Sequence, residues 1–222
     1  MAEAKRLVIF GDSIAKGVMF QDGRYHLCRA HDFDALAQQG VEVRNFAKMG
    51  ACTDTGLAIA KKQLELCQGA QVLLSFGGND CDFDWQAVSD HPDGVHLPKL
   101  PAEQFLENYR TLMDLVRQAA SRVWLSSLVP LEAHRFLDHV SQGRSRENIL
   151  FWLGDTDRIF RWQEYYNDLV CRLSRELSCP LLELRPEFLK DPDFPALLSM
   201  DGIHPTQKGH DLIHRCVGEE MF

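Results

Sequence analysis

Short apolar runs alternate with longer amphipathic stretches along the chain. The runs carry few polar interruptions, a pattern typical of parallel strands that helices cover on both faces. The stretches between them repeat apolar residues at every third or fourth position, which predicts helices. Five runs predict strands, at residues 6–10, 41–46, 70–76, 122–128 and 180–184.

The amphipathic stretches at 57–67, 105–116 and 162–177 predict three helices. A last helix is expected from Pro205 through Cys216, because proline suits a first helical turn. Strands that alternate with helices predict an α/β fold, namely a three-layer α/β/α sandwich around a five-stranded parallel sheet. The composition does not shift along the chain, so we expect a single domain over residues 1–222.

Two stretches lack a regular apolar period and predict long loops. Residues 81–101 are rich in proline, and residues 130–155 are rich in histidine, arginine and aromatic residues. Both follow predicted strands at their carboxyl ends, on the same rim as Ser13. Loops longer than about 15 residues in compact domains tend to be functional or mobile.

The charge, the length of the apolar runs and the cysteine spacing limit the partners and the compartment that we expect. The formal net charge is -8, with 24 basic against 32 acidic residues, and no basic stripe favours nucleic acid. No apolar run approaches the roughly 18 residues that span a membrane, and no secretory signal is visible. The seven cysteines lack CxxC spacing. This pattern indicates reduced thiols and not a disulfide framework. We expect a cytoplasmic protein that binds neither nucleic acid nor membrane; the pattern does not indicate an oligomeric state.

Ser13 is the first candidate for chemistry. It follows a predicted buried strand, and open α/β sheets place their reacting groups at this end of the strands. A serine that attacks a carbonyl needs a base, and His204 is the best of nine histidines because Asp201 precedes it by three residues. The carboxylate would hold one imidazole nitrogen and leave the other to accept the serine proton.

Three hydrogen-bond donors are candidates for an oxyanion hole. They are the backbone N–H of Ser13, the backbone N–H of Gly50 and the side-chain amide of Asn79. Glycine lets a backbone approach a ligand closely, and Asn79 follows a strand in a glycine turn. We also expect the Ser13 amide to lie near the start of a helix, where negative charge is favoured.

Four short segments carry these residues. They are distinct from one another and are spread over nearly the whole chain. They are Gly11-Asp12-Ser13, Gly50 after residues 45–49, Gly77-Gly78-Asn79-Asp80, and Asp201-Gly202-Ile203-His204-Pro205. Together they resemble the signature blocks of the SGNH (GDSL-type) hydrolases; Ile14 stands where the family name has leucine.

The resemblance implies a flavodoxin-like sheet of strand order 2-1-3-4-5 and ester hydrolysis without a metal or organic cofactor. It implies that Ser13 is the nucleophile, His204 the base and Asp201 the partner of that base. It also implies that Gly50 and Asn79 donate hydrogen bonds to the oxyanion.

The same residues allow other interpretations. Asp201 and His204 could cap the last helix, a role compatible with catalysis. Ser13 and Lys16 fit a Ser-x-x-Lys pattern, but the Ser-Asp-Asn and Lys-Thr-Gly motifs that accompany it are absent from the sequence, so Lys16 is expected to be a solvated helix residue. Asp12 and Asp80 are expected to brace turns.

Two groups of residues near the blocks could form a pocket. Phe83 and Trp85 are candidates for a pocket wall, with a small separate core as the equal alternative. Cys52 and Cys81 follow two of the blocks, and small buried apolar side chains are the favoured interpretation.

Metal and anion sites are less favoured. Cys81, His91 and His96 match no familiar ligand spacing, so we expect no metal. A cluster of cations in the second predicted loop could bind an anionic group, although a solvated surface is favoured; these residues are His134, His139, Arg144 and Arg146.

We therefore expect a serine hydrolase that cleaves carboxylic esters through an acyl-enzyme. The mixed, proline-rich stretch at 81–101 favours short acyl or acetyl esters of small polar or carbohydrate substrates. A lysophospholipase or thioesterase on the same scaffold is one alternative. A non-catalytic binding module that keeps the fold is another, since fold alone does not decide function.

Overall fold

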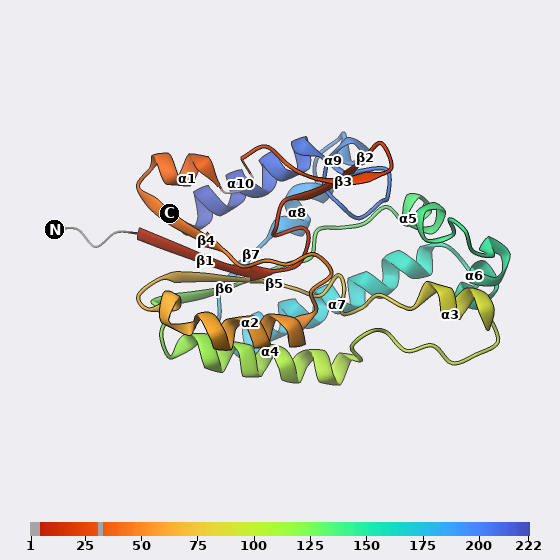
Figure 1. Ribbon diagram of the computed structural model, residues 1–222, viewed down its shortest axis with the longest axis horizontal. Helices are drawn as coiled ribbons and strands as arrows, with labels where there is room; N and C mark the ends of the chain where they lie inside the picture. Colours follow the sequence, from red (N-terminus) through yellow and green to blue (C-terminus); the bar gives the residue numbers. More distant parts are fainter. Residues whose placement is uncertain (1–4, 31–32) are drawn as a thin grey trace.

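A parallel sheet forms the centre of the computed structural model, which describes residues 5–30 and 33–222 (Figure 1). The predicted strands all appear, the last of them shortened to two residues because Leu184 already begins a helix. The described part contains a five-stranded sheet of order β4-β1-β5-β6-β7 with every neighbouring pair parallel, which is the predicted order 2-1-3-4-5. The strands are β1 (Lys5–Gly11), β4 (Val41–Asn45), β5 (Gln71–Ser75), β6 (Arg122–Ser126) and β7 (Leu181–Leu182).

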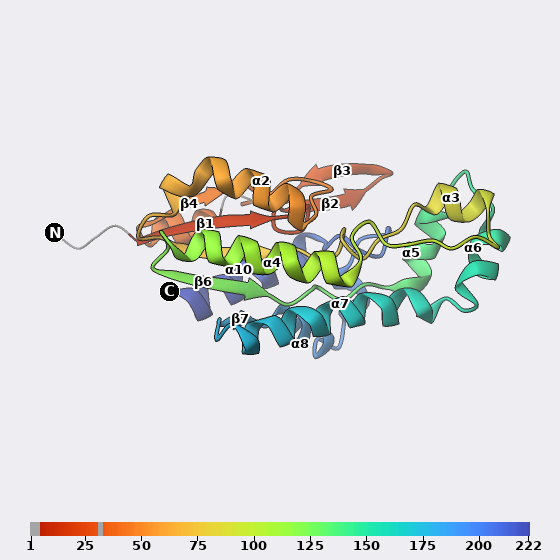
Figure 2. The same cartoon turned by 90° about the horizontal axis from the view of Figure 1, so that it is seen from below.

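Helices cover both faces of this sheet, as the apolar strands require. One face carries α2 (Thr53–Gln63), the short 3-10 helix η1 (Leu64–Cys67), α4 (Ala102–Arg117) and α7 (Asp157–Glu176). Figure 2 shows α4 lying between α2 and α7 on this side. The other face carries α1 (Asp34–Gln38), α8 (Leu184–Leu189), α9 (Phe194–Leu197) and α10 (Gln207–Met221).

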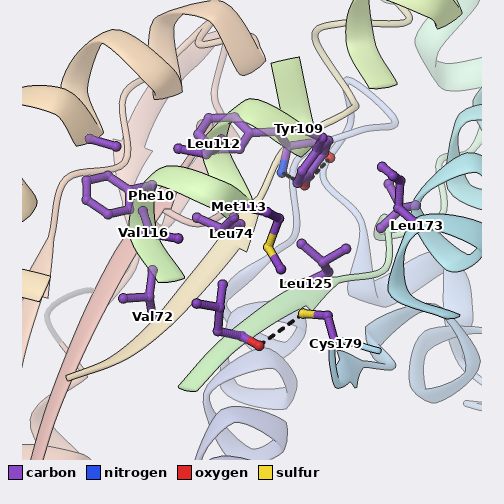
Figure 3. Packing of buried hydrophobic residues seen from close by; sticks show 14 of the residues in the cluster. Phe10, Val72, Leu74, Tyr109, Leu112, Met113, Val116, Leu125, Leu173 and Cys179 are labelled. Carbon is purple, nitrogen blue, oxygen red and sulfur yellow. Dashed lines mark hydrogen bonds between the residues drawn. The ribbon is translucent and has the colours of Figure 1, made fainter. Parts of the chain in front are cut away.

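The larger core lies between β1, β5 and β6 and the first helical face. Leu112, Met113 and Val116 of α4 are fully buried against strand residues such as Leu74 and Leu125 (Figure 3). The i, i+3 and i+4 spacing of the apolar residues in α4 produces this contact. The amphipathic pattern therefore places α4 correctly against the sheet.

The opposite face has its own core. Leu7 and Ile9 of β1 point to this side, because side chains alternate along a strand, and they pack with Leu212, Ile213 and Val217 of α10. The final helix is thereby fixed beneath the strand that precedes Ser13. Its start differs from the expectation: α10 begins at Gln207, and the hydroxyl of Thr206 caps it by accepting from the Gly209 N–H at 3.4 Å.

Three features at the carboxyl ends of the strands were missed or wrongly predicted. No helix follows Ser13; a turn leads instead into an antiparallel hairpin of β2 (Val18–Gln21) and β3 (Arg24–Leu27). The stretch 81–101 contains α3 (Trp85–Asp90), and 130–155 contains α5 (Ala133–Val140) and α6 (Arg146–Leu153). These three helices extend the molecule beyond the sheet (Figure 1) and enclose a small core of their own.

Within residues 5–30 and 33–222, no helix combines the length and the apolar character needed to cross a bilayer.

Candidate active site

The nucleophile candidate lies in the turn that ends β1. The Asp12 N–H donates to Ser75 O of β5 at 3.2 Å, and the Val18 N–H donates back to Ser13 O at 2.9 Å. Gly11 is required here, since a Cβ on it would lie 2.5 Å from the Ala15 Cβ. The turn is therefore held to the sheet on one side and to the hairpin on the other, with the Ser13 side chain buried at its tip.

Ser13, His204 and Asp201 form one chain of hydrogen bonds. The Ser13 hydroxyl lies 2.8 Å from His204 Nε2, and His204 Nδ1 lies 2.6 Å from Asp201 Oδ2. A carboxylate oxygen accepts only, so the proton sits on Nδ1 and Nε2 is left to accept from the serine hydroxyl. All three side chains are buried. The structure thus brings together three predicted residues, two of which are 191 positions apart.

Asp201 is oriented by the backbone that follows it. Its Oδ1 accepts from the Ile203 N–H at 3.3 Å and from the His204 N–H at 3.1 Å, while Oδ2 faces the imidazole. Gly202 makes this tight turn possible, with φ at 78° in the left-handed region. The local Asp-x-x-His spacing is sufficient to build this half of the site, and neither residue caps α10.

The three predicted oxyanion donors line one pocket together with His204. Within the described residues, the Ser13 and Gly50 backbone N–H groups and the Asn79 side-chain amide make no hydrogen bond to the protein. Gly50 has φ at 73°, which suits glycine far better than other residues. Three donors are thus left available beside the Ser13 hydroxyl.

Asp12 and Asp80 support the site, as predicted, by bracing turns. Asp12 Oδ1 accepts from the Ile14 N–H at 2.9 Å, and Asp80 Oδ1 accepts from the Thr53 N–H at 2.8 Å and from its hydroxyl at 2.6 Å. Burial raises the pKa of each carboxyl to about 6, because low-dielectric surroundings disfavour the charged form.

The pocket beside Ser13 has a volume of about 260 Å³ and mostly apolar walls. Phe83 and Trp85 line it, as predicted, and they belong at the same time to the small core of α3, α5 and α6. The Phe83 ring centroid lies 4.9 Å from that of Trp152 and 5.7 Å from that of Trp162. Aromatic rings from distant segments therefore meet around Phe83.

Several pocket residues were not predicted. Trp152 of α6 and Trp162 of α7 flank Phe83, while Arg158 lies 4.8 Å from the Trp152 ring centroid. Tyr25 of the hairpin also lines the pocket, and its ring centroid lies 5.3 Å from that of His204, with the two rings edge to face. An available signal for α6 was the Ser145 cap, whose hydroxyl accepts from the Asn148 N–H at 3.2 Å.

The remaining cysteines and lysine near the blocks play no visible part in the chemistry. Cys81 is buried in the pocket wall and its thiol donates to Gly78 O at 3.3 Å, while Cys52 is half-buried and does not line the pocket. Burial raises the pKa of both thiols, that of Cys52 to about 12. Lys16 lies in the turn after Ser13, so the expectation of a helical residue was wrong.

The less favoured metal and anion sites do not form in the described part of the chain. The ligand atoms of Cys81, His91 and His96 do not gather, and His96 Nε2 instead lies 2.8 Å from His91 O. Of the predicted cation cluster only His139 reaches the pocket. The others face elsewhere: His134 is exposed, Arg144 bonds Val140 O and Arg146 pairs with Asp138.

Comparisons with known proteins agree with this geometry. The sequence profile described as the GDSL-like lipase/acylhydrolase family matches residues 9–212. An acetylxylan esterase from Geobacillus stearothermophilus, Axe2, shares the fold with a TM-score of 0.67 at 18% identity, over 99% of this chain and 94% of that one. A lipase/acylhydrolase from Enterococcus faecalis gives 0.66 at 19% identity, over 98% and 95%. No curated protein sequence is significantly similar to the chain.

The solved structures, at these identities, show a shared fold. The family match goes further, because it spans most of the chain and includes Ser13, Asn79 and His204. The chain therefore belongs to the GDSL-like lipase/acylhydrolase family and is an esterase of the SGNH type.

Proposed function

We propose that Ser13 attacks the carbonyl carbon of a carboxylic ester and forms an acyl-enzyme. The observation that carries this proposal is the hydrogen-bond chain from the Ser13 hydroxyl through His204 to Asp201. A serine hydroxyl is a weak nucleophile on its own, and an adjacent oriented imidazole activates it. The buried Asp201 stabilises the imidazolium that forms as the proton moves.

Each step then has a group in place. As Ser13 Oγ bonds to the carbonyl carbon, its proton passes to His204 Nε2 and negative charge develops on the carbonyl oxygen. The Ser13 and Gly50 N–H groups and the Asn79 amide stabilise that oxygen. The imidazolium next gives its proton to the leaving alcohol. In the second half, His204 accepts a proton from a water that attacks the acyl carbon. The bond from that carbon to Ser13 Oγ then breaks, the imidazolium returns the proton to Oγ, and the acid is released.

The size of the pocket supports a small substrate. A volume of about 260 Å³ lies near the lower end of the range for small-molecule sites, and it suits a short acyl group better than a long chain. Flat aromatic walls around Phe83 and polar groups such as Arg158 and Gln163 suit a compact alcohol with both apolar and polar faces. We infer short acyl or acetyl esters of small polar or carbohydrate alcohols.

The apolar lining also favours a second candidate on the same scaffold. Trp85, Trp152 and Trp162 could enclose a longer acyl chain, as a lysophospholipase or thioesterase would require. The two candidates differ in one measurable property, which is how the rate depends on acyl length.

The experiment compares acetyl, butyryl and octanoyl p-nitrophenyl esters and an acyl thioester. We expect kcat/KM to be highest for the acetyl or butyryl ester. We also expect Ser13→Ala to lower kcat for every substrate by at least about 1000-fold, because the nucleophile is lost. Circular dichroism should show an unchanged fold.

Ser126→Ala serves as the matched control, because Ser126 is also buried at the carboxyl end of a strand but lies outside the pocket. It should retain normal turnover. Substantial hydrolysis by Ser13→Ala would overturn the role of Ser13. A preference for the octanoyl ester or the thioester would overturn the short-acyl proposal and leave the nucleophile in place.

A further inference from the structure

Three metal-binding side chains meet on the face of the sheet away from α4. Cys28 follows the β2–β3 hairpin, and His210 and His214 lie on α10. One ligand atom from each residue, a sulfur and two imidazole nitrogens, lies within 4.8 Å of the other two. Cys28 and His210 are at most 2% exposed, and His214 is half-buried.

Helix α10 supplies two of the three side chains. Residues four apart share one face of an α-helix, so His210 and His214 project to the same side. The chain that leaves β3 runs along this side of α10 towards α1 (Figure 1), which brings Cys28 to the pair. The Phe33 ring lies 4.3 Å from the His214 ring, centroid to centroid, and covers that side of the cluster.

The state of the His210 ring points to a ligand. Its Nε2 lies 2.9 Å from Val18 O, and a carbonyl oxygen accepts only, so Nε2 carries the proton. The lone pair of the neutral ring is therefore on Nδ1. That nitrogen is buried and has no hydrogen-bond partner among the described residues. A histidine that donates one ring N–H to a backbone carbonyl while its other nitrogen is available is arranged as metal-bound histidines are.

We propose that Cys28, His210 and His214 bind a zinc-type divalent cation. One thiolate and two neutral imidazoles form a donor set that suits zinc, with water as the fourth ligand of a tetrahedral site. On binding, Cys28 forms a bond to the metal through sulfur and its thiol proton passes to solvent; no oxidation or reduction takes place. This site is separate from the ester chemistry.

The contacts of the three residues assign the cation a structural role. It would fasten the hairpin to α10, where the Arg29 N–H already donates to Gln207 Oε1 at 2.8 Å. The Val18 carbonyl that orients His210 belongs to the same residue whose N–H donates to Ser13 O. The cation would therefore stabilise the hairpin from which Tyr25 contacts His204.

The test begins with the unmodified chain, produced without a polyhistidine tag in medium supplemented with zinc. We expect about one zinc ion per chain by elemental mass spectrometry after gel filtration. Adding cobalt to the metal-free protein should give a thiolate-to-cobalt charge-transfer band. Chelation should lower the melting temperature, and zinc should restore it, because binding to the folded state alone stabilises it.

Site variants locate the metal. Cys28→Ser, His210→Gln and His214→Gln should each lose most of the zinc, and Cys28→Ser should abolish the charge-transfer band. Cys171→Ser and His134→Gln, which alter a half-buried cysteine and an exposed histidine elsewhere, should keep both. Ser13→Ala should keep both as well, so a failure of the proposed ester mechanism would not affect this result.

Two outcomes would overturn the proposal. One is a metal-free protein that takes up no zinc or cobalt at stoichiometric concentrations; this uses the wild type and does not depend on any variant folding. The other is zinc that persists in His210→Gln and Cys28→Ser but is lost from a His204→Ala variant, which would place the metal at the candidate active site.

Discussion

Asn79 differs from the other asparagines near the sheet in how its amide is used. Asn45 donates to Ala15 O at 2.9 Å and accepts from the Ala47 N–H at 3.0 Å, so it holds two segments together. Asn167 accepts from the Leu128 N–H at 3.0 Å. The Asn79 side chain makes no such bond within the described residues, although it lines the pocket. Its amide is therefore available to a reacting group.

This difference predicts that two similar substitutions affect different properties, the turnover rate in one case and the stability in the other. Asn79→Ala should lower kcat on p-nitrophenyl acetate by about 100-fold or more, as the loss of one oxyanion donor does, with little change in stability. Asn45→Ala should lower the free energy of unfolding by about 1–2 kcal/mol through its lost bonds. For both variants, steady-state kinetics measures kcat and urea unfolding measures the free energy of unfolding. An unchanged kcat in Asn79→Ala would remove it from the oxyanion site.

At the scale of single residues, the site was the most predictable part of the molecule. Ser13, Asn79 and His204 carry distinct local patterns in the sequence, and the structure brings them to one pocket. The cluster of Cys28, His210 and His214 was not predicted, because Cys28 lies in an unpatterned segment far from the two histidines. Spacing within one helix can suggest a pair of ligands but not a third from elsewhere.

At the scale of elements, hydrogen bonds and close packing join α5 to the turn that carries Asp201. The Glu132 N–H donates to Gly202 O at 2.8 Å, and the Glu132 side chain caps α5. A Cβ on Gly202 would lie 2.5 Å from Glu132 O and 2.6 Å from the Phe136 nitrogen. Arg135 of the same helix donates to Leu198 O at 2.9 Å. The start of α5 therefore fixes the backbone on either side of Asp201.

Gly202→Ala should consequently reduce both stability and activity. The positive φ and the two backbone contacts together should cost about 2 kcal/mol or more, and the displaced turn should lower kcat. Gly143→Ala is the matched control: its φ of 71° is similar, but a Cβ there meets no atom within 4 Å. It should lose only about 1 kcal/mol and keep normal kcat. Equal effects in both variants would contradict the packing argument.

The elements that escaped prediction are short, like α1, α8 and α9 on the sheet, or they lie away from the sheet. The β3 strand is exposed along its whole length, so it has no apolar alternation to reveal it. Helices α3 and α5 are short, and their apolar residues pack on one another instead of on the sheet. Their clearest signals were the caps, Asp84 and Glu132, whose carboxylates accept from the first turn of each helix. The spacing of apolar residues, used on its own, detects the long helices that lie against the sheet.

For the molecule as a whole, the two buried carboxyls beside the site link stability to pH. The pKa of Asp80 is about 6 in the folded chain, against the ordinary value of 3.8, because of burial. Between these values the folded state binds more protons than the unfolded state, so the free energy of unfolding falls as pH rises. The stabilising contribution is complete below pH 4 and is lost as pH rises through about 6. Asp12 acts in the same direction.

Asp80→Asn should remove the contribution of Asp80 to this dependence and leave that of Asp12. Asparagine Oδ1 can still accept from Thr53, but the asparagine side chain does not ionise, so the decrease in unfolding free energy from pH 4 to pH 7 should shrink by about 2 kcal/mol. Urea unfolding at pH 4, 5, 6 and 7 measures the difference. Asp114→Asn, which alters an exposed carboxyl in α4, is the control. Parallel curves for wild type and Asp80→Asn would contradict the expected linkage.

The overall architecture followed from the sequence because parallel strands are buried on both faces and therefore read as apolar runs. The strand order was expected from the family resemblance and is observed. The pocket wall depends on contacts such as Phe83 with Trp152, which join segments nearly 70 positions apart and leave no local pattern. The arrangement of the residues around Ser13 was thus easier to predict than the wall of the pocket.

The separation of Ser13 from His204 by 191 positions bears on how the chain is made. A ribosome makes the serine before the histidine, so the two cannot meet until the segment that carries His204 has emerged. Contacts so distant in sequence form late because closing a long loop is costly in entropy. The growing chain therefore carries Ser13 without its imidazole partner until the turn that carries His204 has been made and has folded onto it.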